Sequence, residues 1–324
     1  MLTTEISCIY TQNGKCRRMH NLICMPDLKS VEEFNKRLGK VANIKSDGRP
    51  IVGLSSYELL KLALEVCPNC MFIPAHIWTP WFSLFGSKSG FDSIKECFLD
   101  LADFIKICET GLSSDPLMNW GVADLNGVTL ISNSDAHSFE KLGREANMLD
   151  CELSYDAIKT CFLTRKGFLK TIEFYPEEGK YHYDGHRDCD VCLHPKESKK
   201  NNNICPVCKK KLTVGVLSRV MDLTCQKESE FKSKIPFINL IPLKEIIASH
   251  FGCGVNTKKV AKVYSDFILK FKNEFNVLLN LKEEDCLGFE HYDICCDIVK
   301  AREGKVEKQS GYDGVFGVIK VNKK

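Results

Sequence analysis

Four cysteines arranged as two close pairs constrain this chain more than any other feature of its sequence. Cys189 and Cys192 form one C-x2-C pair, and Cys205 and Cys208 form a second one after a gap of twelve residues. The segment around them, residues 179–215, is rich in lysine and asparagine and has too few apolar residues to bury a core of its own. Two such pairs supply four thiolates for one tetrahedral zinc ion, which would hold the segment together. We therefore predict a closed structural zinc site with four cysteine ligands and no open position for catalysis.

Two histidines leave a variation of this zinc site open. His186 and His194 flank the cysteine pairs, and either imidazole could replace one thiolate. A third C-x2-C pair, Cys67 and Cys70, has no partner pair, so we interpret it as a coincidence in a chain of 18 cysteines rather than as a redox pair. A high cysteine count in a long chain is typical of a reducing compartment. We therefore expect a cytoplasmic protein whose thiols are mostly free.

The cysteine-rich segment divides the chain into three parts. Residues 1–178 alternate between short apolar runs, typical of strands, and helical patterns, which favours an α/β domain with a parallel sheet or barrel. Residues 216–324 have mainly helical patterns. Ser30, with Glu33 three residues later, predicts a helix N-cap. Further helices are predicted at residues 56–66, 155–164, 243–250, 258–273 and 293–302.

Composition and the absence of several motifs exclude some classes of protein. No apolar run approaches the ~18–20 residues that a membrane helix needs, and the first residues do not resemble a signal peptide, so we expect no membrane partner. The chain has 45 basic and 42 acidic residues, and a net charge of +3 neither requires nor excludes a nucleic acid. It has no G-x4-G-K-[ST] loop and no G-x-S-x-G elbow, which argues against an ATPase and against a serine hydrolase of the elbow type.

Five side chains that can bind a divalent metal lie within or after apolar, strand-like runs. They are Glu5, His20, His76, Asp135 and His137. Asp135 and His137 are two residues apart, and on an extended chain such residues point to the same side. In a (β/α) barrel, residues at the C-terminal ends of the strands converge on one face, where such ligands could hold metals that activate water. A single histidine after a strand is more often structural, so spacing alone leaves the metal site open.

A loop with several aromatic residues directly follows His76. Trp78, Trp81 and Phe82 lie within six residues of it. At the mouth of a barrel, such side chains can stack on bases or wedge a duplex, or they can pack as a lid. A glycine-containing turn at residues 252–260 offers backbone N–H groups to a phosphate, although it also fits a plain helix connection.

Several longer motifs occur together in a fixed order. They are residues 74–81 (PAHIWTPW), 85–90 (FGSKSG), 109–116 (ETGLSSDP), 132–138 (SNSDAHS), 179–187 (GKYHYDGHR), 302–306 (REGKV) and 311–317 (GYDGVFG). Together they resemble endonuclease Q, a family of DNA repair endonucleases with a PHP domain. The resemblance implies a distorted (β/α) barrel of the PHP type over residues 1–178, a zinc module over 179–215 and a helical region with possible DNA contact over 216–324. It also implies metal-dependent incision of DNA on the 5′ side of uracil, hypoxanthine, xanthine or an abasic site.

The resemblance also assigns roles to single residues. Glu5 matches the bridging carboxylate of the PHP site, His20 and His76 match histidine ligands, and Asp135 and His137 match its last motif. Glu5, Asp135 and His137 would be catalytic, and the site would hold Mg²⁺, Mn²⁺ or Zn²⁺ in addition to the structural Zn²⁺. Side chains suited by type and position to contact damaged DNA are Trp78, Trp81, Phe82, Lys88, Arg144 and Arg187.

One feature departs from the family pattern. PHP domains begin with a strand that carries H-x-H, and this motif does not occur in the chain. Because Glu5 is already the fifth residue, we expect the first strands of the barrel and some metal ligands to be absent, as in a fragment with impaired activity. Two other functions stay open: a PHP phosphoesterase that acts on a small phosphate, and a non-catalytic remnant that binds damaged DNA.

Overall fold

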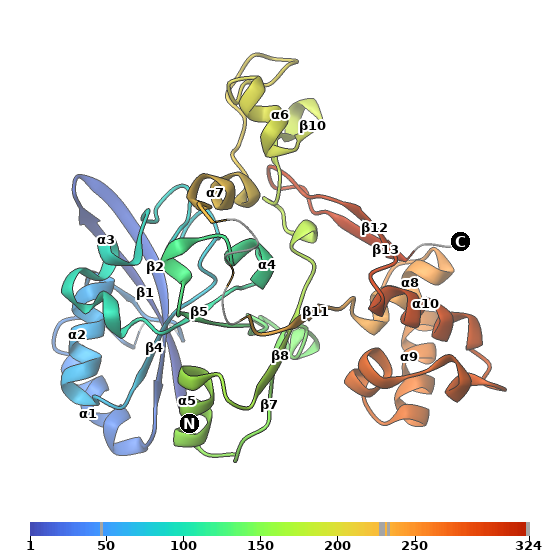
Figure 1. Cartoon of the computed structure of the whole chain (residues 1–324), viewed down its shortest axis with the longest axis horizontal. Coiled ribbons are helices and arrows are strands. Elements are labelled where there is room, and N and C mark those ends of the chain that lie inside the picture. The colour runs from blue at the N-terminus through green and yellow to red at the C-terminus, as the bar shows by residue number, and fades with distance from the viewer. Residues whose placement is uncertain (46–47, 227–230, 232–233, 322–324) are drawn as a thin grey trace.

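The computed structural model describes residues 1–45, 48–226, 231 and 234–321 of the 324-residue chain (Figure 1). The N-terminal part is a mixed α/β unit, the segment 179–215 projects from it, and a group of helices lies to the other side. We call residues 179–215 the cysteine module. Within the described residues, no helix combines the length and the apolar character needed to cross a membrane.

A four-stranded sheet with the order β3-β1-β2-β4 forms one wall of the N-terminal part. Its strands are β1 (Leu2–Gln12), β2 (Lys15–Met25), β3 (Ile51–Val52) and β4 (Met71–Pro74). β2 is antiparallel to both β1 and β4, whereas β3 runs parallel to β1. The prediction of a parallel sheet is therefore only partly correct. Asn13 and Gly14, both with positive φ, form a tight turn that joins β1 to β2 without a crossover helix.

Two helices cover this sheet and bury much of the first hydrophobic core. They are α1 (Leu28–Leu38) and α2 (Ser56–Val66), and the second has the bounds that its sequence predicts. A capping box between Ser55 and Glu58 begins α2. The predicted cap of α1 is wrong by one turn: Asp27 is the N-cap, and its side chain accepts from the backbone N–H of Ser30.

The remaining strands complete the N-terminal part and lead to its edge. β5 (Ile107–Glu109) and β6 (Thr129–Ile131) are parallel, and a second sheet has the order β11-β8-β7. Its strands are β7 (Ala146–Leu149), β8 (Phe168–Glu173) and β11 (Phe237–Asn239), with α5 (Tyr155–Thr164) between the first two in the chain. Short helices connect these elements: α3 (Ile94–Phe98), η1 (Leu99–Phe104), α4 (Pro116–Asn119), η2 (Ala123–Leu125), η3 (Phe139–Lys141) and η4 (Pro176–Glu178).

The cysteine module is anchored to the N-terminal part by a buried carboxylate and by a helix. Its elements, with the helix that follows, are β9 (Asp184–His186), η5 (Arg187–Cys189), β10 (Val191–Leu193), α6 (Pro195–Lys200) and α7 (Val216–Leu223). Asp184 is buried and accepts hydrogen bonds from the Gly215 N–H at 2.7 Å and the Ser218 hydroxyl at 2.8 Å. α7 packs Val216 and Val220 into the first core and so joins the end of the module to the N-terminal part.

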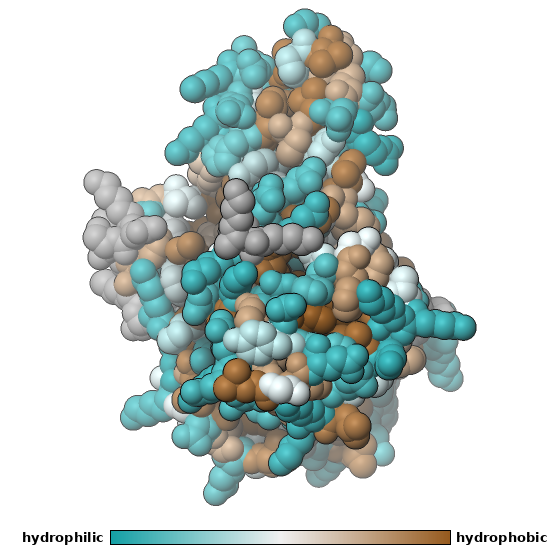
Figure 2. Space-filling model, turned by 90° about the vertical axis from the view of Figure 1, so that its right-hand side faces the viewer, coloured by the Kyte–Doolittle hydropathy of each residue, from teal (hydrophilic) through white to brown (hydrophobic). Residues whose placement is uncertain are grey.

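The C-terminal part is a helical bundle with an added β-hairpin, so it is not helical throughout. The bundle contains α8 (Leu243–Phe251), α9 (Lys258–Phe271), η7 (Asn276–Asn280), η8 (Glu283–Cys286) and α10 (Tyr292–Arg302). Phe267 lies in its core, and a disulfide joins Cys286 to Cys295. From the side of these helices, the surface is mostly hydrophilic with small separate hydrophobic patches (Figure 2).

The hairpin connects the C-terminal part back to the cysteine module. It consists of β12 (Val306–Gln309) and β13 (Val318–Val321), which pair antiparallel. The loop between them returns to the module: the Tyr183 N–H donates to the Gly311 carbonyl at 2.9 Å, and the Arg187 N–H donates to the Asp313 carboxylate at 2.7 Å. The three parts of the chain are therefore joined by more than their linkers.

Candidate metal centre and nucleic-acid interface

Three of the five predicted metal ligands meet at one point. On the β1–β2 hairpin, Glu5 pairs with Leu22 and Ser7 pairs with His20, so Glu5 and His20 are diagonal neighbours on the same face. His76 follows β4, the next strand of the sheet. His20 Nδ1 lies 2.8 Å from Glu5 Oε1 and 3.0 Å from His76 Nε2, and His76 Nε2 lies 3.6 Å from the same Glu5 oxygen.

The geometry of this cluster fits a divalent metal. Ligand atoms held about 2.0–2.2 Å from one ion are roughly 3.0–3.5 Å apart, which is close to the spacing of these three atoms. Two imidazole nitrogens that face each other and one carboxylate oxygen cannot all be satisfied by a single proton. A cation at their common point satisfies all three lone pairs, so we regard Glu5, His20 and His76 as a candidate metal centre.

The electrostatics of the cluster favour a charged carboxylate. Burial opposes ionisation of Glu5, but the hydrogen bonds from His20 and His76 outweigh it and hold its pKa well below the usual value. Burial also lowers the pKa of His20, which favours the neutral imidazole that a metal needs. At His76, burial is outweighed by Glu5, Glu109 and Asp135, which together raise its pKa. The carboxylate of Asp135 is therefore close enough to act on the cluster.

Glu109, which was not predicted as a site residue, holds the backbone of His76 in place. Its side chain accepts from the His76 N–H at 2.8 Å and from the Asn133 amide at 2.8 Å, and burial raises its pKa. Gly111, at φ 64°, lies so close to His76 that an added Cβ would collide with the His76 Cβ. The signal that could have identified Glu109 is its place at the end of β5, which matches the place of His76 after β4.

Asp135 and His137 lie at the rim of the cluster, in the segment 132–144 that we call the rim loop. Asp135 has φ 43°, so the chain is not extended there and the two side chains are not placed by strand alternation. His137 Nδ1 faces the Asp135 carbonyl at 3.0 Å and lies 3.9 Å from Asp135 Oδ1. The His137 side chain is 76% exposed. Within the described residues, neither of the two joins the three ligand atoms that lie within 4.8 Å of one another.

Two neighbours of the cluster have positions that the sequence did not predict. Arg49 was not predicted as a site residue, and Phe82 was predicted only as a DNA contact. Arg49 Nη1 lies 3.3 Å from Glu5 Oε1, which places a cation at the edge of the cluster. The Phe82 ring lies 4.7 Å from the His20 ring, and the Phe82 carbonyl accepts from the His20 N–H at 3.1 Å. Phe82 therefore covers the cluster from the aromatic loop.

The two tryptophans of the aromatic loop differ in exposure, since one is buried in the core and the other lies at the surface. Trp78 is only 1% exposed, and its indole N–H donates to Asn119 Oδ1 at 2.6 Å. The prediction that Trp78 stacks on DNA is therefore corrected, because this side chain belongs to the first core and is not accessible. Trp81 is 41% exposed and lies edge-on to Tyr181 at 6.1 Å, so it stays available for stacking.

The three basic residues predicted to contact phosphate differ in their surroundings. Lys88 is exposed, and the Arg187 guanidinium is exposed at the cysteine module. Arg144 donates to the Ser134 carbonyl at 2.9 Å and to the Asp135 carbonyl at 3.3 Å. Its guanidinium is thus engaged in holding the rim loop.

Two further carboxylates, Glu145 and Glu173, are buried beside the rim loop. The Glu173 carboxylate accepts from the Thr110 hydroxyl at 3.1 Å, and the Glu145 carboxylate accepts from the Phe174 N–H at 3.1 Å. Burial raises the pKa of both groups, that of Glu173 to about 8. Burial of these two neighbouring carboxyls therefore favours the protonated form of Glu173 at neutral pH.

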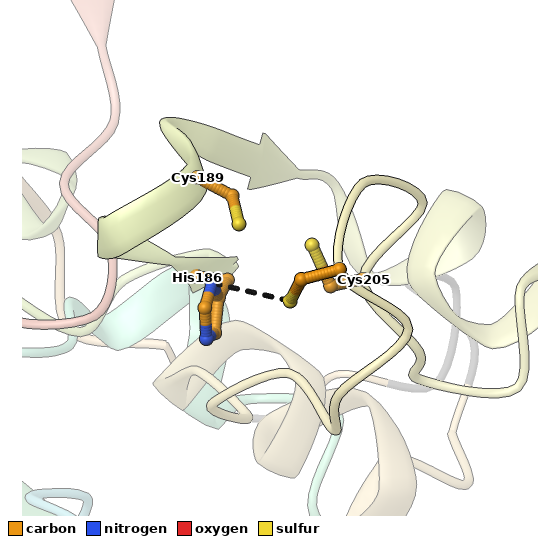
Figure 3. Close-up of side chains that lie close together, drawn as sticks. His186, Cys189 and Cys205 are labelled. Carbon is orange, nitrogen blue, oxygen red and sulfur yellow. Dashed lines mark hydrogen bonds between the residues drawn. The ribbon is translucent and has the colours of Figure 1, made fainter.

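The cysteine module brings together a ligand set that differs from the predicted one. His186, Cys189, Cys205 and Cys208 form the second group of close metal-ligating atoms in the described part of the chain. Figure 3 shows the first three side chains pointing toward one another, and the dashed line marks the 3.8 Å contact between Cys208 Sγ and His186 Nδ1. Cys192 is exposed and directs its sulfur to the Ser310 carbonyl at 3.8 Å.

The backbone around Cys205 favours its thiolate. Burial opposes ionisation, but the N–H groups of Cys208 and Val207 outweigh it and lower the pKa of this thiol. Val191, Cys205 and Leu212 form a small core around the sulfurs. The four residues thus fit a tetrahedral zinc ion with three sulfur ligands and one nitrogen ligand.

Two solved structures are similar to this chain over its whole length. The lesion-specific endonuclease PfuEndoQ from Pyrococcus furiosus has a TM-score of 0.88 and 28% identity, and the match covers 100% of this chain and 78% of that one. Endonuclease Q in complex with a 27-mer duplex substrate carrying an abasic lesion has a TM-score of 0.85 and 29% identity, covering 100% and 79%. The chain belongs to the endonuclease Q family.

One family model and two uncharacterized proteins are also similar to this chain. The family model of the MJ0043 C-terminal domain matches residues 242–305, which contain α8 to α10. The uncharacterized protein YqxK of Bacillus subtilis is 32% identical over 314 residues, which cover 93% of this chain and 74% of YqxK. The uncharacterized protein MJ0043 of Methanocaldococcus jannaschii is 33% identical over 281 residues, which cover 83% of this chain and 35% of MJ0043. The chain thus spans about a third of the length of MJ0043.

Proposed function

We propose that this chain is a metal-dependent DNA endonuclease that cuts the backbone on the 5′ side of a lesion. The lesion would be a deaminated base (uracil, hypoxanthine or xanthine) or an abasic site. The observation that carries the proposal is the convergence of Glu5, His20 and His76 in a chain whose full length superimposes on endonuclease Q. In this reading, residues 1–178 form a PHP-type barrel and the cysteine module is a structural zinc module.

The metal would be held by Glu5, His20 and His76, with Asp135 and His137 at its rim. Mg²⁺, Mn²⁺ or Zn²⁺ would lower the pKa of a bound water and polarise the phosphate that is cut. Glu109 keeps His76 in position through its backbone N–H. This arrangement of ionised carboxylate and imidazole ligands is one that oxygen- and nitrogen-binding divalent ions prefer.

Three side chains at the rim suit the handling of a phosphodiester. His137 is exposed in the rim loop with its Nδ1 facing the Asp135 carbonyl, and its imidazole would hold or give a proton to a group that reaches the rim. Arg49 offers a guanidinium near Glu5, where a phosphate oxygen would accept hydrogen bonds. Trp81 supplies an exposed aromatic face for an unstacked base.

Contact with the rest of the duplex would come from the surface around this edge. We propose Phe82, Lys88 and Arg187 as further DNA contacts, with Arg144 acting indirectly because its guanidinium holds the rim loop. Contacts of this kind position the backbone, and they make binding salt-dependent because each one releases counterions.

The test is incision of a 5′-labelled duplex that carries a single deoxyuridine, beside an undamaged duplex, with Mg²⁺ or Mn²⁺ added. We expect one nick on the 5′ side of the uracil. We expect Asp135→Ala to lower its rate at least about 100-fold, since loss of a metal-site carboxylate costs more than loss of an outer contact. Asp103→Ala, which removes an exposed carboxylate of the same N-terminal part, should leave the rate unchanged.

Two results would contradict the proposal. One is an unmodified chain that loads metal, as measured by elemental analysis, and still leaves the damaged strand intact. The other is a chain that hydrolyses a chromogenic phosphate ester in an Asp135-dependent way without any DNA incision, which would identify a small-phosphate phosphoesterase instead.

A further inference from the structure

Two large apolar side chains are exposed in the rim loop. Phe139 is 83% exposed and Leu142 is 71% exposed. They are three residues apart on a turn of 3-10 helix, in which the Leu142 N–H donates to the Phe139 carbonyl at 3.3 Å. Leu142 is the C-cap of this turn, and residues at this spacing lie near each other, so we call the exposed pair the apolar protrusion.

This protrusion is held in place by its own loop. The Gly143 N–H donates to the Ser134 hydroxyl at 2.8 Å, and Arg144 donates to the carbonyls of Ser134 and Asp135 at 2.9 and 3.3 Å. The Ser134 hydroxyl itself donates to the Glu145 carbonyl at 3.0 Å. The exposure of the apolar pair is therefore a feature of an ordered loop.

The polar residues of the same turn are tied to the C-terminal part. Glu140 pairs with Lys244 at 3.4 Å, and Lys141 pairs with Glu245 at 3.7 Å, both on α8. The charged side chains thus face the helical bundle, while the apolar ones are left in solvent. A surface loop that exposes its apolar residues and engages its charges is typical of a binding element.

The position of the protrusion relates it to the metal centre. Because an extended chain spans at most about 3.6 Å per residue, the backbone of Phe139 lies within roughly 7 Å of His137 and roughly 14 Å of Asp135. The major groove of DNA is about 12 Å wide. A duplex whose phosphate lies at the candidate metal centre is thus wide enough to extend over the distance that separates Asp135 from this loop.

We propose that Phe139 and Leu142 form a wedge that enters the base stack at the lesion and fills the space left by the extruded nucleotide. Proteins that kink or open DNA insert apolar side chains between base steps in this way, and a lesion that pairs poorly makes the step easier to open. The inference rests on the proposed function, since it needs a damaged duplex at the metal centre.

The experiment compares the full chain with Phe139→Ala/Leu142→Ala and with Leu153→Ala as a matched control. Leu153 is 99% exposed in the same part of the chain, outside the rim loop. Duplexes carry an abasic-site analogue beside the fluorescent base 2-aminopurine, whose emission rises on unstacking, and all three proteins also carry Asp135→Asn so that the strand stays intact. We expect a clear rise in 2-aminopurine emission with the parent and with the Leu153→Ala control, and at most a fifth of that rise with the double variant.

Incision rates on two substrates, measured without Asp135→Asn, complete the test. On duplex uracil DNA, we expect the double variant to be slower by about tenfold or more, since the variant lacks the side chains that would offset the cost of opening a base step. On single-stranded uracil DNA, where no gap has to be filled, we expect the rate of the parent. Equal loss on both substrates, or no loss on either, would overturn the wedge and leave the protrusion as a protein contact or a structural element. If the parent itself neither binds nor cuts damaged DNA, the proposed function fails first and the wedge fails with it.

Discussion

Replacing His186 by alanine should release zinc from the cysteine module, whereas replacing Cys192 by serine should leave the zinc bound. The reason is the register of β9 and β10, in which Val191 lies opposite His186 and Cys192 lies opposite Gly185. Side chains alternate between the two faces of a strand, and Val191 is buried in the small core around Cys205. His186 therefore shares the face of the sulfurs, and Cys192 points to the other face.

The magnitude follows from the number of ligands. A structural zinc site binds with an apparent free energy of about 10–16 kcal/mol at neutral pH. Shared over four ligands, this assigns roughly 2.5–4 kcal/mol to the imidazole of His186. At about 1.4 kcal/mol per factor of ten, His186→Ala should weaken zinc binding about 60- to 700-fold. For Cys192→Ser, we expect a change of less than about twofold, because only the weak 3.8 Å contact of its sulfur with the Ser310 carbonyl is lost.

The assay is competition for zinc with a chromogenic chelator under reducing conditions, together with thermal unfolding before and after chelation. Cys205→Ser is the positive control, and His194→Ala is the matched negative control, since His194 caps α6 and packs against the Tyr183 ring and is not one of the four candidate ligands. Zinc loss in Cys192→Ser as large as in Cys205→Ser, or full zinc retention in His186→Ala, would show that strand register does not select the ligands and would restore the site with four cysteine ligands.

Three further predictions concern the metal centre and its surface. Trp81→Ala should leave the melting temperature unchanged but weaken binding to lesion DNA by about 1–3 kcal/mol, the value of one stacked base. Trp78→Ala should instead destabilise the fold by about 3–5 kcal/mol. The reverse pattern in melting and binding curves would contradict the assignment of Trp78 to the core and Trp81 to the surface. Gly111→Ala should lower both the melting temperature and the metal affinity, because the new methyl group collides with His76 and because the backbone of residue 111 has a positive φ. Unchanged metal titrations would count against this contact. Burial raises the pKa of Glu173 to about 8, above its ordinary value of 4.5, so the folded state binds more protons between these values and the free energy of unfolding should fall as the pH rises through this window. Glu173→Gln should flatten that dependence, and an equally steep pH profile in urea titrations would show that the group is not buried as a neutral acid.

Local patterns predicted the helices well, because their signals lie within a few residues. The bounds of α2 and α5 are confirmed, since each helix has an N-cap serine and apolar residues at helical spacing. The N-cap of α1 was placed on Ser30 because serine followed by glutamate resembles a capping box, but Asp27 competes for the same backbone donors and begins the helix earlier. Errors of this kind stay within one turn.

Pairing between distant segments was harder to predict from the sequence. The antiparallel insertion of β2 depends on the tight turn at Asn13 and Gly14, and the alternating pattern of strands and helices does not contain that change of strand direction. Glu109 was not assigned to the site because a single glutamate after a short apolar run has no spacing signal, although β5 brings it to His76. The choice between His186 and Cys192 likewise depends on strand register, which the cysteine spacing does not contain.

The rim loop explains why recognition and cutting of a lesion could be linked in this chain. It carries Asp135 and His137 at one end and the apolar pair Phe139 and Leu142 at the other, and Arg144 binds carbonyls of the segment that holds Asp135. A displacement of the apolar pair by an intact base stack would therefore be transmitted through a short, hydrogen-bonded loop to the rim of the metal centre. If the apolar pair enters a gap in the stack, the loop keeps the geometry seen here, and Asp135 keeps its place at the rim of the metal centre. Arg144→Ala should therefore lower incision of duplex lesions more than it lowers DNA binding, because the substitution loosens this loop without removing a phosphate contact. Equal losses of incision and of binding would show that Arg144 contacts the DNA directly.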